Sequence, residues 1–109
     1  MKIDVMQVLK GFEGQELKAI DENGKSSPIT VQKAINLAIN GVEIKNGQVQ
    51  PLTAEEKGRI YHLSSKIWSG KEVDFTNDDM VFIKERAGKV NNISPIIYGR
   101  LCDLFETKG

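Results

Sequence analysis

The residues from Glu72 to Asp79 constrain the fold more than any other part of the chain, because they join a short extended segment to the start of a helix. Glu72-Val73-Asp74-Phe75 alternates polar and apolar side chains, as a strand with one buried face does. Thr76 then suits an N-cap, with Asp79 at the third helical position, where a carboxylate meets free amide groups and the positive end of the helix dipole. We therefore expect a strand-to-helix junction at Thr76.

Three more helices are indicated by caps and by apolar residues at helical spacing. Thr53-Ala54-Glu55-Glu56 is a capping box, and Pro95 after Ser94 suits a first helical position, where a missing N–H costs nothing. The four helices are expected at 31–40, 54–68, 77–90 and 95–106. Their expected buried faces are Val31, Ala34, Ile35, Ala38 and Ile39; Ile60, Leu63 and Ile67; Met80, Ile83, Ala87 and Val90; and Ile97, Leu101, Leu104 and Phe105.

The first 28 residues favour extended structure. Residues 2–9 and 16–20 mix apolar with polar positions, and Asp21-Glu22-Asn23-Gly24 is a turn signal. Val5, Val8 and Leu9 also fit one helical turn, but Gly11 and Gly14, which lie between the two runs, favour strands. We expect an N-terminal β-hairpin here. Residues 42–49, with Asn46-Gly47 in their middle, fit either a second small hairpin or a linker.

These patterns predict an α+β fold in a single domain, residues 1–109. A hairpin-like part, 1–28, precedes a helical part, 30–106, whose last three helices pack as a small bundle, and Thr107-Lys108-Gly109 forms a polar tail. A chain of 109 residues is long enough for one modest core.

Composition narrows the classes of partner and compartment. Fifteen Lys and Arg balance fifteen Asp and Glu, so net charge gives no general attraction to nucleic acid or to an anionic membrane. Cys102 is the only cysteine, which excludes an intrachain disulfide and suits a reducing compartment. The start of the chain lacks the apolar stretch of a signal peptide, and no run approaches the roughly 18 apolar residues of a membrane span. We expect a cytoplasmic protein without a membrane segment.

A calcium site is one interpretation of the acidic segment. Asp74, Thr76, Asp78 and Glu85 fall at positions 1, 3, 5 and 12 of a calcium-binding loop, but position 6 is Asp79 instead of the glycine that makes the sharp turn. Helix capping explains the same residues without a metal. We therefore expect neither a metal nor another cofactor.

The sequence contains no strong pattern of catalytic residues. His62 is the only histidine, and a pair of Cys102 with His62 requires two packed helices to bring them together. Cys102 lies among leucines in a helical pattern, where a thiol behaves as a small apolar group. The common phosphate-binding and hydrolase motifs are absent from the sequence. We expect a protein that is not an enzyme.

Two binding hypotheses remain. Tyr61, Trp68 and Ile96 lie at the edges of the predicted buried faces and form a candidate protein-binding or self-association patch, unless the N-terminal hairpin covers them. The alternative is a DNA-binding regulator in which the last two helices act as a helix-turn-helix. Its candidate phosphate contacts are Lys84, Arg86, Lys89 and Arg100.

The chain also resembles a family of small bacteriophage and prophage proteins of unknown function. The likeness covers about half the chain, from Leu52 to Glu106, with its acidic lead-in Glu72-Val73-Asp74 and its closing helix from Ser94-Pro95-Ile96-Ile97 onward. It is a pattern of spacing, and no site residue is transferred by it. The resemblance implies a phage or prophage origin and, as the commoner role of such proteins, interaction with a host or phage protein.

Overall fold

The computed structural model describes residues 1–106 and confirms the expected α+β class. The elements, in chain order, are β1 (Lys2–Asp4), β2 (Lys18–Ile20), β3 (Ser26–Pro28), α1 (Val31–Ile39), β4 (Ile44–Lys45), β5 (Gln48–Val49), α2 (Ala54–Ile67), β6 (Glu72–Asp74), α3 (Asn77–Lys89) and α4 (Pro95–Glu106). The expected polar tail, residues 107–109, lies outside the described residues.

The helices begin where their caps predict. The Thr53 and Thr76 hydroxyls accept from the backbone N–H of Glu56 and Asp79, and each carboxylate accepts in return from the threonine N–H. Thr30 caps α1 by accepting from the Lys33 N–H. These bonds satisfy N–H groups that would otherwise lack partners in the first helical turn.

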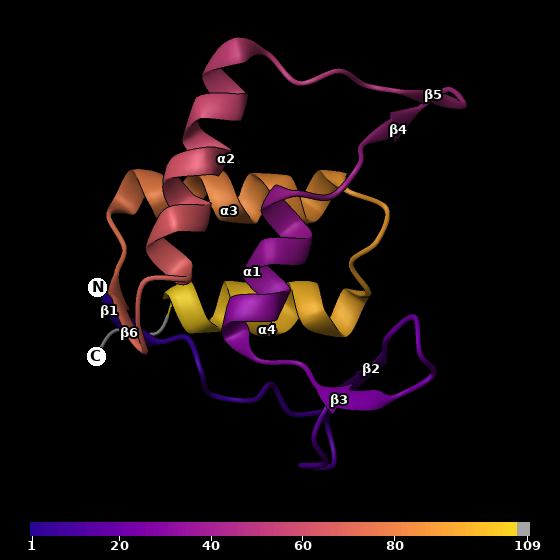
Figure 1. Ribbon diagram of the computed structural model, residues 1–109, viewed down its shortest axis with the longest axis vertical. Helices are drawn as coiled ribbons and strands as arrows, with labels where there is room; N and C mark the ends of the chain where they lie inside the picture. Colours follow the sequence, from indigo (N-terminus) through magenta and orange to yellow (C-terminus); the bar gives the residue numbers. More distant parts are fainter. Residues whose placement is uncertain (107–109) are drawn as a thin grey trace.

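The core lies between the helices. As expected, α2, α3 and α4 are packed together, and α1 lies among them and contacts all three, most extensively α3. In Figure 1, α3 and α4 lie side by side and α1 crosses both of them. All the residues predicted to face inward are buried except Leu104, which is half-buried at the edge of the core.

The strands form three two-stranded antiparallel pairs, β1–β6, β2–β3 and β4–β5. An N-terminal hairpin is present, but its strands are β2 and β3, which flank the turn at residues 21–25. Residues 2–4 take no part in this hairpin, because β1 pairs with β6, with Ile3 opposite Val73. The runs 2–9 and 16–20 also meet beside the glycine turn, where Lys10 bridges Glu16 and the Leu17 N–H donates to the Leu9 carbonyl at 3.0 Å.

Residues 42–49 form a hairpin, which resolves the choice that the sequence left open. Asn46 and Gly47 have φ values of 54° and 76°. Positive φ at both central residues is what a two-residue turn with the twist of β-strands requires. This hairpin and β2–β3 both project beyond the helices on the right of Figure 1.

Candidate functional site

The exposed face of α2 contains two of the three residues predicted for protein binding. Tyr61 is 77% exposed and Trp68, the C-cap of α2, is 55% exposed. Seven residues make almost two complete helical turns, so both side chains leave α2 on nearly the same side. The N-terminal hairpin therefore does not cover them.

Trp68 borders a cavity of about 180 Å³ with a mostly apolar lining. The other lining residues come from β2, from α1 and from the residue between β3 and Thr30: Ala19, Ile29, Lys33, Asn36 and Leu37. An apolar hollow beside an exposed tryptophan is a typical setting for the central contact of a protein interface. We call this cavity and Trp68 the Trp68 groove.

Polar contacts fix the walls of the Trp68 groove. The Gln32 side-chain amide, which is buried, donates to the Ile67 carbonyl at 2.9 Å and so ties α1 to the end of α2. The Lys33 ammonium donates to the Ser27 hydroxyl and to the Pro28 carbonyl, both at 3.3 Å, and so ties α1 to β3. The groove is therefore built before any partner arrives, which lowers the entropy that binding would cost.

Ile96 does not belong to the Trp68 groove. It lies in the first turn of α4, where it is half-buried and packs against the core. Its neighbour Ile97 points into the core and is buried. The three predicted residues therefore do not form one patch: Tyr61 and Trp68 share a face of α2, and Ile96 supports the core from another helix.

The four cations of the DNA-binding alternative are largely occupied within the protein. Arg86 is 2% exposed, and its guanidinium donates to the Gly41 carbonyl at 2.7 Å, so its assignment as a phosphate contact is wrong. Arg100 donates to the carbonyls of Lys10 and Gly11, and Lys84 pairs with Glu106 at 3.7 Å. Lys89 is exposed. This arrangement gives little support to a phosphate-binding surface.

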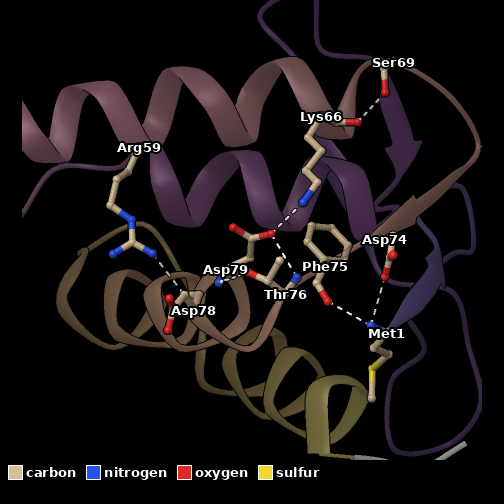
Figure 2. A network of polar contacts seen from close by, with 9 residues as sticks. All are labelled: Met1, Arg59, Lys66, Ser69, Asp74, Phe75, Thr76, Asp78 and Asp79. Atoms are coloured by element: carbon tan, nitrogen blue, oxygen red, sulfur yellow. Dashed lines mark hydrogen bonds and ion pairs between the residues drawn. The ribbon is translucent and has the colours of Figure 1, made fainter.

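Residues of the calcium hypothesis are engaged in other contacts, as Figure 2 shows for Asp74 and Thr76. Asp74 accepts from the amine of Met1 at 3.0 Å, while Thr76 caps α3 and the Asp79 carboxylate receives the Lys66 ammonium at 2.7 Å. Glu85 is exposed on α3. Within residues 1–106, no three His, Cys, Asp or Glu side chains lie together as metal ligands would.

The Asp79 carboxylate is stabilised in its charged form within this network. Its burial raises the pKa, but the hydrogen bonds from Lys66 and from the Thr76 N–H outweigh that effect and hold the pKa below the ordinary aspartate value. Arg59 lies beside it, stacked at 4.7 Å on the Phe82 ring and donating to the Asp78 carbonyl. The network thus joins α2 to the start of α3.

His62 and Cys102 occupy different surroundings. His62 is exposed and lines a shallow hollow with Arg59 and Asp79, between α2 and the start of α3. Cys102 is half-buried on α4, one turn after Tyr98, and the thiol raises the pKa of the Tyr98 hydroxyl. Nothing in this geometry favours a catalytic pair.

Sequence reasoning missed two exposed apolar residues, Phe12 and Ile20. Phe12 is 86% exposed in the glycine turn, with the Arg100 guanidinium 5.3 Å from its ring centre. Ile20, at the end of β2, is 76% exposed. The position of Phe12 in a turn between two glycines was a sequence signal for its exposure. The exposure of Ile20 could not be predicted without knowing which strand β2 pairs with.

In the described part of the chain, no helix has the length and apolar character needed to cross a bilayer. Compared with protein-family models, curated proteins and solved structures, the chain matches none of them. The Trp68 groove is thus the feature of the molecule that bears most directly on function.

Proposed function

We propose that this protein is a non-enzymatic protein-binding module of phage or prophage origin, which works in the cytoplasm of a bacterial host and contacts its partner through the Trp68 groove. The supporting observation is the half-exposed indole of Trp68 beside a preformed apolar hollow, with Tyr61 exposed on the same side of α2. Large aromatic side chains that lie next to a pocket provide much of the binding energy of protein interfaces. The origin rests on the family resemblance.

The test is affinity capture from host-cell lysate, with and without nuclease, followed by mass spectrometry. The parent protein is expected to retain a discrete protein after nuclease treatment, and Trp68→Ala is expected to lose it. Phe12→Ala is the matched control, because it removes another exposed aromatic ring that lines a different hollow. It should retain the partner.

Three results would contradict the proposal. A partner that binds Trp68→Ala as well as the parent would exclude the groove, and one lost only from Phe12→Ala would move the site to the glycine turn. Recovery only through nucleic acid would favour the DNA-binding alternative, whose binding should fall steeply with salt. A variant is interpreted only if its circular dichroism spectrum matches that of the parent, which shows that it is folded.

A further inference from the structure

We infer that β2 is a docking edge for an extended segment of the partner, which adds to the β2–β3 pair as a third strand and inserts an aliphatic side chain into the Trp68 groove. The inference rests on the proposed function and states what kind of partner the groove accepts. Three observations support it: the free edge of β2, the blocked edge of β3, and the face to which Ala19 belongs.

The free edge follows from the pairing of β2 with β3. The Leu17 carbonyl accepts from the Ile29 N–H at 2.8 Å, and the Asp21 N–H donates to the Lys25 carbonyl at 2.9 Å. Antiparallel ladders alternate, so Ala19, opposite Ser27, also directs its N–H and C=O toward β3. The backbone groups of Lys18 and Ile20 therefore point away from β3 and are available to another strand.

The opposite edge of the hairpin is closed to strand addition. Pro28 has no N–H to offer, and the Lys33 ammonium occupies its carbonyl at 3.3 Å. Proline and lysine are the residues with which proteins prevent pairing at sheet edges. The hairpin thus has one protected edge and one edge that remains able to pair.

The side chains on the two faces of β2 define what a third strand would contact. Ala19 lies on the face that lines the Trp68 groove, and the exposed Ile20 lies on the other face. Every second side chain of an added strand falls on the Ala19 face, beside the groove. A cavity of roughly 150 Å³ accepts a benzene ring, so 180 Å³ suits one Leu, Ile or Val side chain.

The charge around this edge favours an acidic partner. Lys18 and Lys25 are exposed on the hairpin, and Lys33 is bound only to neutral acceptors. The Asp21 carboxylate accepts from the N–H groups of Asn23 and Lys25 within the turn, and Glu22 lies at the tip. We therefore expect an extended segment with an aliphatic residue flanked by Asp or Glu.

The experiment is selection of a displayed library of short random peptides on the whole protein, followed by amide hydrogen exchange with one selected peptide. The selected peptides should share an aliphatic residue with acidic neighbours. On binding, the N–H groups of Lys18 and Ile20 should become protected, while that of Ser26, on the closed edge, should not change. An empty selection, or protection elsewhere without protection of these two amides, would overturn the inference.

Substitutions separate backbone pairing from the groove. Ile20→Pro removes one outward N–H and is expected to weaken peptide binding about tenfold, the effect of one or two main-chain hydrogen bonds. Ser26→Pro makes the same change on the closed edge and should leave affinity unchanged. Ala19→Leu, which fills the groove without touching the ladder, should weaken binding as strongly as Ile20→Pro.

The captured partner distinguishes this inference from the proposed function. A partner lost by both Trp68→Ala and Ile20→Pro supports both ideas. One lost by Trp68→Ala but retained by Ile20→Pro and Ala19→Leu would overturn strand addition and leave the binding module intact. A partner retained by all three variants would overturn both.

Discussion

At the scale of single residues, Arg86 joins α3 to the end of α1 from a buried position. Its charge is buried where α3 meets the end of α1, and its hydrogen bond to Gly41 satisfies a carbonyl at the negative end of α1. In the described part of the structure, its Nε has no hydrogen-bond partner. Arg86→Ala should lower the free energy of unfolding by about 2–4 kcal/mol, because it opens a cavity and leaves Gly41 unpaired.

The measurement is urea-induced unfolding, with Lys89→Ala as the control. Lys89 lies on the same helix and has the same charge but is exposed, so its loss should change stability by less than about 0.5 kcal/mol. Equal effects of the two substitutions would contradict a stabilising role for the buried guanidinium and its hydrogen bond to Gly41.

Asp79 allows a prediction about pH. Asp79→Asn should lower the free energy of unfolding at neutral pH by about 1–3 kcal/mol, between the cost of losing a helix cap and that of breaking a buried ion pair. Because the pKa is lowered by folding, the stabilisation is complete above the unfolded-state pKa and is lost as pH falls through the folded-state pKa. The difference between parent and variant should therefore shrink in acid.

Urea unfolding of both proteins at neutral and acidic pH checks this expectation. Asp78→Asn is the neighbouring control, since Asp78 is exposed and its side chain acts only near the helix dipole, with an effect of about 0.5 kcal/mol. A stability difference for Asp79→Asn that is the same at both pH values would contradict the assigned ionisation.

At the scale of elements, the two capping boxes should differ in importance. Thr53 and Thr76 make the same pair of hydrogen bonds, but the Asp79 partner of Thr76 also binds Lys66. Thr76→Ala should therefore cost more than Thr53→Ala, which should cost about 1 kcal/mol. Thermal unfolding followed by circular dichroism measures both. A larger loss from Thr53→Ala would show that the network around Lys66 adds nothing to the cap.

The helices were predictable from sequence because their signals are local. A capping threonine and an apolar residue every third or fourth position lie within a few residues of one another. The partner of β1 was not predictable, because β6 lies about seventy residues later and three residues offer too little pattern to select it. The Trp68 groove was missed for the same reason: Trp68 was identified, but Ala19 reaches it only through tertiary packing.

At the scale of the whole molecule, the core joins every helix and both ends of the described chain. The cluster of buried apolar residues extends from Ile3 on β1 to Phe105 on α4, where the Phe105 ring meets Phe75 edge-on at 5.8 Å between centres. The pairing of β1 with β6 brings the first residues against the segment that starts α3. Neither β1 nor β6 can leave the core without exposing the buried apolar side chains of the other strand to water.

This shared core predicts a single unfolding transition. Trp68 fluorescence reports the edge of α2 and far-ultraviolet circular dichroism reports all helices, and the two curves in urea should coincide. Val73→Ala, which removes buried volume from β6, should shift both curves equally, by about 1–3 kcal/mol. If Val73→Ala shifted only the fluorescence curve, β1, β6 and the end of α2 would unfold separately. The Trp68 groove would then open before the rest of the molecule, which is incompatible with a preformed site.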